Sequence, residues 1–321
     1  MVEVAPFDDQ ALAQFIADNS GVLNFHPVSK GRDLKQVKWV PGTDCLLLLF
    51  MHRDLKRGSS VTLRMVSLSS RKVVHEVELS GVDSNCRLEV NDDLLYLING
   101  SHLGIYNVNT LTLVHTFEFN SYVYSISFEQ GTPKAYVVLG RFIFQIDTQL
   151  FTKTKIHEGA EHGSGSFYYF HPETQVALST FSYDGSSIET SHNLTTGQGS
   201  SIQWDGQVKF IRSLDLFAMT SNDTPRQISL HDPNTFAKVS EATSPVDCRW
   251  FIPLSGTNYI IAGFTDTALD VTNWRIFTTL PQIADPSNPG RIVSFTMFDW
   301  NESLRCIVSG SAEGIVRFTV I

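Results

Sequence analysis

The chain has 321 residues, of which 42% are hydrophobic and 18% are charged, and its formal net charge is −9 at pH 7. This composition excludes an intrinsically disordered chain, and the negative charge argues against bulk binding to nucleic acid or to anionic membranes. The length exceeds the usual size of one hydrophobic core, unless the fold consists of repeated units that each bury their own faces.

Apolar runs and cysteines indicate the compartment. The longest apolar run, Cys45–Met51, has the length of a strand and is too short to span a membrane. The first residues lack the basic and apolar regions of a signal peptide. The other cysteines (Cys86, Cys248 and Cys306) are far apart, which favours buried free thiols over disulfides or a zinc site. We expect a cytoplasmic or nuclear protein, or one found in both, without membrane insertion.

Residues 1–20 predict a short N-terminal helix, because Asp8 or Asp9 can cap it. The residues that would share its apolar face are Ala11, Leu12, Phe15 and Ile16. Residues 21–28, G-V-L-N-F-H-P-V, then predict a strand, in which Pro27 is tolerated near the end.

An internal repeat organises the rest of the chain. Each repeat contains an alternating strand that ends in a polar turn, after which a new strand begins. These turns are centred on Ser69, Asn109, Thr148, Thr195, Asn234 and Asn273, with the chain end near Val320 as the seventh equivalent. The spacings are 40, 39, 47, 39, 39 and 47 residues, and insertions at 158–165 and 284–290 lie in the two long intervals.

Each repeat contains about four strand-like runs. In the second repeat these are Cys86–Val90, Leu94–Ile98, Leu103–Val108 and Leu111–Phe119. Four strands in about forty residues, repeated seven times, predict an all-β chain with the fold of a seven-bladed β-propeller. The last hairpin, Phe298–Ile321, would leave an open sheet edge, so we expect residues 21–28 to pair with it as the closing strand of the last blade.

The repeats resemble WD-repeat blades. The last one contains S-G-S-x-x-G-x-V-R, with Phe318 where that family usually has tryptophan, and residues 37–43 resemble the V-x-F-S-P-D-G opening. The Trp-Asp dipeptide is replaced at every position, for example by Tyr106-Asn107. The resemblance, from Lys35 to Ile321, implies a divergent WD-repeat propeller that serves as a rigid scaffold for other protein subunits.

The expected organisation is one domain over residues 1–321, with the blades in 33–321. Its interaction surface should come from hairpin loops within blades and from the junctions between blades. The candidate partner-binding residues are Arg53, Lys56, Arg57, Tyr122, Arg141, Asp184, Asp205, Asp266 and Arg291. Tyr124, Tyr183 and Trp300 lie near predicted loop junctions and are further interface candidates.

A second pattern is a cation one residue before an apolar anchor of an inner strand. It occurs at Lys38, Arg87, Lys209 and Arg249. If these positions share a rim, they form a partial basic ring that could bind RNA or a phosphopeptide, and such binding would weaken steeply with salt. The alternative is that their long stems pack between the blades.

Catalytic and metal motifs are weak. The densest cluster of possible ligands, H-E-G-A-E-H at 157–162, reads as a solvated loop, so no metal or cofactor is expected. No nucleophile elbow or phosphate-binding loop occurs in the sequence. We therefore expect a protein that is not an enzyme. A sugar-lactone hydrolase is the enzymatic alternative, and it would need carboxylates that converge at the channel mouth.

Overall fold

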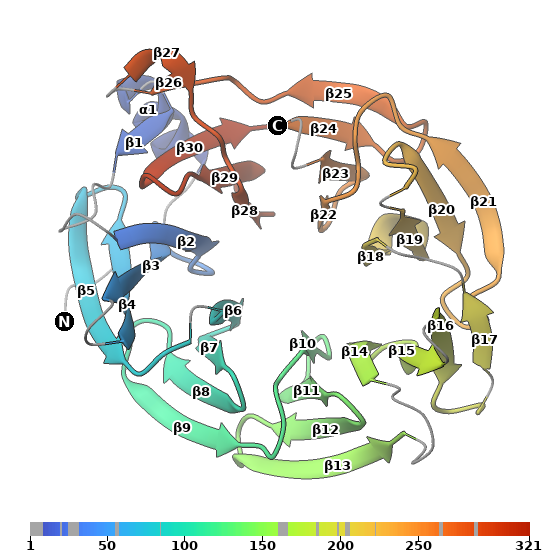
Figure 1. Cartoon of the computed structure of the whole chain (residues 1–321). Coiled ribbons are helices and arrows are strands. Elements are labelled where there is room, and N and C mark those ends of the chain that lie inside the picture. Colours follow the sequence, from blue (N-terminus) through green and yellow to red (C-terminus); the bar gives the residue numbers. More distant parts are fainter. Residues whose placement is uncertain are drawn as a thin grey trace. The chain divides into compact units, whose positions relative to one another are not determined.

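The computed structural model describes most of the chain. The residues it describes are 9–19, 21–24, 32–54, 58–83, 85–159, 166–183, 186–197, 199–202, 206–221, 223–262, 266–285 and 288–321. Within them, seven four-stranded sheets follow one another, together with one two-stranded hairpin and one α-helix (Figure 1). The all-β, seven-bladed propeller predicted from the sequence is confirmed.

The chain divides into two compact units. The first comprises Met1–Asn99, Gly104–Val114 and Leu254–Ile321, and the second comprises Gly100–Leu103 and His115–Pro253. Two of the seven four-stranded sheets contribute residues to both units.

Four sheets lie wholly or partly in the first unit. Their strands are β2 (Arg32–Trp39), β3 (Cys45–Asp54), β4 (Gly58–Ser67) and β5 (Lys72–Ser80); β6 (Arg87–Asn91), β7 (Leu94–Asn99), β8 (His102–Asn107) and β9 (Leu113–Glu118); β22 (Phe251–Leu254), β23 (Tyr259–Ala262), β24 (Thr267–Asp270) and β25 (Arg275–Thr279); and β28 (Met297–Asn301), β29 (Cys306–Gly310), β30 (Ile315–Val320) and β1 (Val22–Asn24). The hairpin of β26 (Ala284–Asp285) and β27 (Asn288–Ile292) occupies the predicted insertion at 284–290.

Three sheets lie in the second unit. Their strands are β10 (Ser125–Phe128), β11 (Lys134–Leu139), β12 (Phe142–Asp147) and β13 (Thr152–Glu158); β14 (Ser166–His171), β15 (Val176–Tyr183), β16 (Ser186–Asn193) and β17 (Gly199–Ile202); and β18 (Val208–Ile211), β19 (Leu216–Thr220), β20 (Gln227–His231) and β21 (Lys238–Thr243). A 3-10 turn, η1 (Arg212–Leu214), joins β18 to β19.

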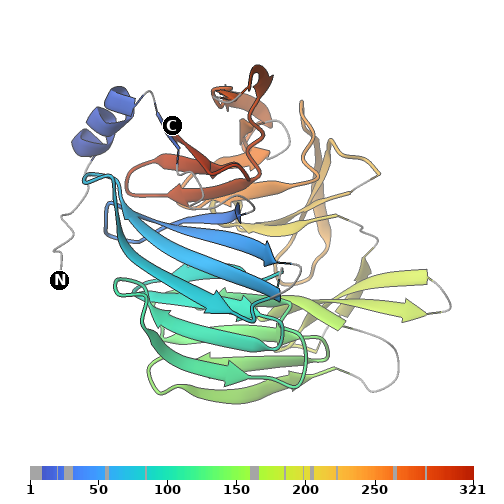
Figure 2. The same cartoon turned by 60° about the vertical axis from the view of Figure 1, so that its left-hand side comes forward.

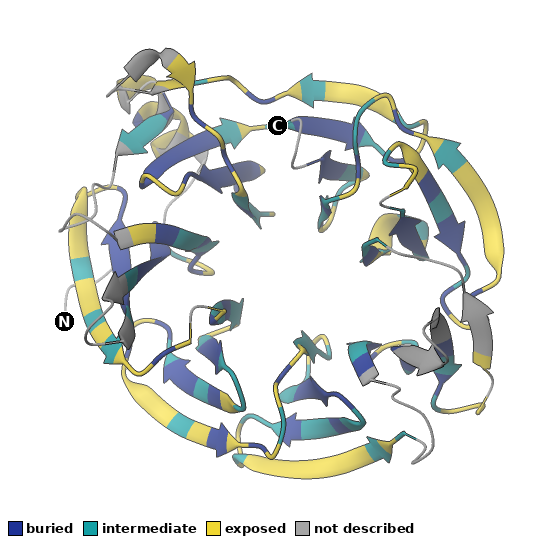
Figure 3. Cartoon of the chain, in the orientation of Figure 1, coloured by how far each residue is buried: buried dark blue, intermediate teal, exposed yellow. Residues whose placement is uncertain are grey.

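Burial follows the position of each strand within its sheet. Strand β3 reads C-L-L-L-L-F-M and is apolar on both faces. Alternate residues enter two different cores: Leu47 and Leu49 pack with residues of β6 and β7, whereas Leu46 and Leu48 pack with residues of β29 and β30. The fourth strand β5, in contrast, is mostly exposed (Figure 3).

In five of the seven four-stranded sheets, one side chain closes the turn before the fourth strand, which helps to explain the repeat seen in the sequence. Asn107, Asp147, Asn193, Asp232 and Asp270 each accept a hydrogen bond from the backbone N–H two residues later. Such Asx turns satisfy the backbone locally and favour a chain reversal. The predicted turn centres Asn109, Thr148, Thr195, Asn234 and Asn273 therefore lie inside these capped turns.

Bulky residues occupy left-handed backbone conformations in several of these turns. Phe236 has φ 59° and Leu111 has φ 54°, although this region favours glycine. The strain of about 1–2 kcal/mol is offset by burying a large side chain, which contributes about 1.5–3 kcal/mol. Phe236 is only 3% exposed, and its ring centroid lies 4.9 Å from that of Phe217.

The closing strand is observed at the N-terminal end of the described chain. Strand β1 pairs antiparallel with β30, with Val22 opposite Arg317 and Asn24 opposite Ile315 (Figure 2). The remainder of the predicted strand, residues 25–28, lies outside the described residues. Because β1 covers the edge of β30, that edge is not left open.

Helix α1 (Asp9–Asn19) precedes β1, as the sequence predicted. Phe15 is buried and meets Phe318 of β30 edge to face, with centroids 5.3 Å apart. Ala11, predicted on the same apolar face, is exposed. Across the described residues, no helix combines the length and apolar character that a bilayer crossing requires.

Replacing Phe15 with alanine is expected to lower the free energy of unfolding by about 2 kcal/mol, because the ring leaves the core that it shares with Phe318. The control is Gln14→Ala on the exposed face of the same helix, where only a hydrogen bond to Asp18 is lost. Urea unfolding monitored by circular dichroism measures both variants. Equal effects would show that the helix does not stabilise the last blade through Phe15.

Candidate functional site

The structure describes some of the predicted partner-binding residues and not others. Lys56, Arg57, Asp184 and Asp205 lie outside the described residues. Arg53 lies in β3 one residue before its end, and its side chain is not among those described. A partner-binding role for these five residues stays a prediction.

Two predicted residues of the first unit form ion pairs. Asp266 lies in the β23–β24 connection and receives the guanidinium of Arg317 at 3.2 Å. Arg291 of β27 pairs with Glu313 at 3.0 Å, and both of these side chains are substantially exposed. Asp266 therefore already holds a buried cation of its own chain, whereas Arg291 remains accessible at the surface.

The remaining two predicted residues, Tyr122 and Arg141, lie at one end of the sheet β10–β13. Tyr122 precedes β10 in an extended segment whose central residue, Val123, is fully buried. The N–H of Val123 donates to the Gly100 carbonyl at 2.9 Å, and the N–H of Tyr124 donates to the Val138 carbonyl at 2.8 Å. Since side chains alternate along an extended chain, burying Val123 turns both tyrosines outward.

The two tyrosines form an exposed aromatic pair. Tyr122 is 38% exposed and Tyr124 is 41% exposed, and their ring centroids are 5.6 Å apart in an edge-to-face arrangement. Their backbone is already hydrogen-bonded, so binding a partner would order little of the main chain.

Arg141 lies in the two-residue turn of the hairpin β11–β12, where Gly140 adopts a positive φ of 49°. Its guanidinium lies 3.6 Å from the carboxylate of Glu158, and its side chain is 36% exposed. A hydrogen bond from Lys155, aided by Arg141, lowers the pKa of Glu158, so this carboxylate stays ionised beside both cations.

We call Tyr122, Tyr124 and Arg141 the tyrosine patch. Tyrosine and arginine are the residue types that dominate binding energy at protein interfaces, because they bury a large area and also form directed hydrogen bonds. Tyr122 and Arg141 are predicted partner-binding residues, and Tyr124 is one of the further interface candidates; all three lie at the same end of the sheet β10–β13.

The cations of the predicted basic rim occupy different strand positions. Trp39 pairs with Leu46 across the turn between β2 and β3, and Phe210 pairs with Phe217 across the turn between β18 and β19. The two turns have the same length, so Lys38 and Lys209, which precede Trp39 and Phe210, occupy equivalent positions. In β6, Val90 is the residue equivalent to Trp39, since it pairs with Leu95 across a turn that is two residues shorter. Glu89, which precedes Val90, is therefore the equivalent of Lys38. Arg87 lies two residues before Glu89.

Two of these cations are paired with carboxylates. The Lys38 ammonium lies 3.0 Å from Glu89 and 3.8 Å from Asp299. Burial opposes ionisation of Lys38, but the two carboxylates outweigh it and raise its pKa above the ordinary value. Arg249, which precedes β22, pairs with Asp247 at 2.6 Å. A continuous basic rim stays a prediction.

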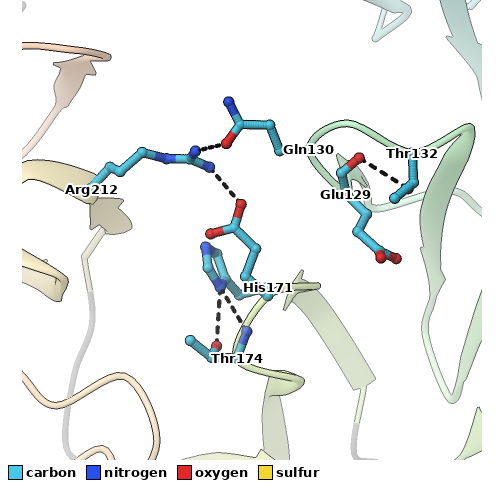
Figure 4. Close-up of polar contacts among 7 residues, drawn as sticks. Glu129, Gln130, Thr132, His171, Thr174 and Arg212 are labelled. Atoms are coloured by element: carbon cyan, nitrogen blue, oxygen red, sulfur yellow. Dashed lines mark hydrogen bonds and ion pairs between the residues drawn. The ribbon is translucent and has the colours of Figure 1, made fainter.

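A polar cluster joins three inner turns of the second unit (Figure 4). Arg212 of η1 donates to Gln130, in the β10–β11 turn, and to Glu173, in the β14–β15 turn, the latter at 2.7 Å. His171 lies beneath it, and its Nδ1 is 3.0 Å from the Thr174 hydroxyl. No local sequence pattern indicates this cluster, because its members come from three successive sheets, which the cluster links.

These sheets, their order and the closing strand define a seven-bladed β-propeller. Solved structures share this fold, among them the following three. A chain of a mitotic checkpoint complex has a TM-score of 0.60 and 13% identity over 94% of this chain and 90% of its own. U3-55K has a TM-score of 0.62 and 9% identity over 94% and 99%.

The third structure, BamB from Moraxella catarrhalis, has a TM-score of 0.52 and 13% identity over 88% of this chain and 83% of its own. At these identities the likeness concerns the fold alone. No protein-family model matches the chain, and no curated protein sequence matches it.

Proposed function

We propose that this chain is a non-enzymatic interaction scaffold that binds another protein subunit through the tyrosine patch. The observation that carries the proposal is the exposed pair of Tyr122 and Tyr124, held outward by the buried Val123 between them. Exposed aromatic pairs are suited to the centre of a protein interface, and Arg141 lies at the same end of the sheet. One of the chains with the same fold comes from a mitotic checkpoint complex, which agrees with a scaffold role.

The test is to purify the tagged chain from its own cells, with and without Tyr122→Ala and Tyr124→Ala together, and to quantify the co-purifying proteins by mass spectrometry. Interface tyrosines commonly contribute about 2 kcal/mol or more each, so at least one partner should fall by about thirtyfold or more. An unchanged melting temperature would show that the variant is folded.

The matched control is Leu150→Ala. Leu150 is 72% exposed and lies in the β12–β13 turn, at the opposite end of the same sheet. It should leave every partner bound. Loss of no partner in the tyrosine variant, or equal losses in both variants, would contradict the proposal.

The alternative of an RNA- or phosphopeptide-binding propeller predicts a different result. Binding through phosphate contacts weakens steeply as salt rises, whereas binding through aromatic side chains responds weakly. Repeating the purification over a series of salt concentrations therefore distinguishes the two functions.

A further inference from the structure

The outer strand of one sheet in the second unit carries a set of cations. Strand β13 is exposed along most of its length (Figure 3). Lys153 and Lys155 are two residues apart on this strand, so their side chains lie on the same face of the sheet. Phe144 of β12 pairs with Lys155 and shares that face. Together with Arg141, in the β11–β12 turn, the two lysines form a surface that we call the basic strip.

Aromatic rings hold the cations of the basic strip in place. The Lys153 ammonium lies 4.8 Å from the ring centroid of Phe119. The Lys155 ammonium and the Arg141 guanidinium both lie over Phe142, at 5.4 Å and 5.9 Å from its ring centroid. Such cation–π contacts orient the charged groups before a ligand arrives, so binding would order few side-chain rotamers.

The charges on this face do not cancel. Arg141 and Lys155 share one carboxylate, that of Glu158. Lys153 forms no ion pair with any described residue and donates instead to the backbone carbonyl of Glu118, whose own carboxylate lies 3.9 Å from a histidine of β8. Three cations and one carboxylate leave a local charge of +2, in a chain whose formal net charge is −9. The strip is therefore a positive surface on a negative chain.

The cations cover the rings beneath them, which bears on the kind of ligand. Phe119 is 8% exposed, and Phe142 lies beneath two cations. Binding of single-stranded nucleic acid depends on ring faces on which bases can stack. The strip offers positive charges without such open faces, so it fits the carboxylates of a protein better than a nucleotide.

We propose that the basic strip binds an acidic segment of the partner protein that the tyrosine patch holds. The inference rests on the function proposed for that patch, and Arg141 belongs to both surfaces. Opposite charges that face each other across an interface accelerate association and fix its register. An acidic segment lacks the condensed counterions of a nucleic acid, so its binding should weaken less steeply with salt than binding to phosphates.

Charge reversal in the co-purification assay tests the strip. Lys155→Glu should lower recovery of the partner about fivefold or more, because it removes an attraction and adds a repulsion. The matched control is Lys238→Glu in β21. Lys238 also pairs with a glutamate three residues later, and its side chain is 50% exposed, against 48% for Lys155. No loss with Lys155→Glu, or equal losses in both variants, would overturn the proposal.

Failure of the strip and failure of the tyrosine patch give different results. A partner lost with Tyr122→Ala and Tyr124→Ala together, but kept with Lys155→Glu, would remove the strip and leave the function proposed for the patch intact. The reverse result would contradict the tyrosine patch and assign the partner to the strip alone.

Two soluble probes identify the chemistry that the strip binds. The full chain is titrated with acetyl-hexaglutamate amide and, separately, with hexauridylate, and backbone NMR shifts are followed. Hexaglutamate should shift the resonances of Lys153 and Lys155 and bind at least as tightly as hexauridylate, since no open ring is present for a base. Tighter binding of hexauridylate would overturn the proposal and assign the strip to RNA. The absence of shifts on β13 with either probe would also overturn it.

Discussion

Replacing Arg317 with leucine is expected to reduce the free energy of unfolding by about 3–5 kcal/mol, because it leaves a largely buried carboxylate without its cation. The Arg317 side chain is 1% exposed and pairs with Asp266 at 3.2 Å. It also donates to the Pro281 carbonyl at 2.6 Å and to the Ser309 hydroxyl at 2.9 Å. Its guanidinium lies 4.0 Å from the ring centroid of Phe295.

The matched control is Arg291→Leu, which removes the same side chain from an exposed pair with Glu313. Exposed pairs contribute about 0–1 kcal/mol, so this change should be small. The double variant Arg317→Leu with Asp266→Leu should recover part of the loss, since it removes both charges. Urea unfolding measures all three. A loss for Arg317→Leu no larger than that for Arg291→Leu would mean that the pair does not hold the last two blades together.

The second expected result is a loss of stability in acid that depends on His171. The pKa of this histidine is lowered to about 4, mainly by burial; the nearby Glu173 opposes the shift and Arg212 contributes to it. The ring is 6% exposed, and its centroid lies 4.2 Å from that of Phe210. The native state therefore holds the neutral ring.

The sign of the effect follows from proton binding. Between about pH 6.5 and pH 4 the unfolded chain binds a proton at His171 and the native chain does not, so stability falls as the pH is lowered. A difference of about 2.5 pKa units corresponds to about 3 kcal/mol. His171→Asn keeps an acceptor for Thr174 but cannot titrate, so its unfolding free energy should fall less over this range.

The measurement is a set of urea unfolding curves for both chains between pH 4 and pH 7. The difference between them isolates His171 from His157, His192 and His231, whose pKa values burial also lowers. Parallel curves for the wild type and His171→Asn would contradict the prediction. The asparagine variant should be less stable at pH 7, because it loses the ring contacts with Phe210 and Phe217.

The sequence predicts the blades well because their signals are local. Strand alternation, and the capped turns at residues such as Asn107 and Asp232, depend on side chains a few residues apart. The closing strand was also predictable, because an unpaired last hairpin requires a partner. These features set the fold before any contact between distant residues is known.

The site was only partly predictable, because it depends on register and on distant partners. Aligning each cation by the apolar residue that follows it makes Arg87 the predicted equivalent of Lys38. The β6–β7 turn is shorter than the β2–β3 turn, however, so the residue in the equivalent strand position is Glu89. The partner of Asp266 is Arg317, from the last strand of the chain, and no local pattern reports that pairing. Tyr122 was predicted because it lies at a junction between strands, a position that the sequence reveals, and its role in partner binding stays a prediction.

The pairing of β1 with β30 joins the most widely separated strands in the sequence. Contacts of such long range form late, since a long loop must close before they are made. We therefore expect the last blade to be absent from the folding transition state. Changes at Phe15 or Arg317 should then accelerate unfolding and leave the refolding rate nearly unchanged, so the closing strand governs how long the native protein persists.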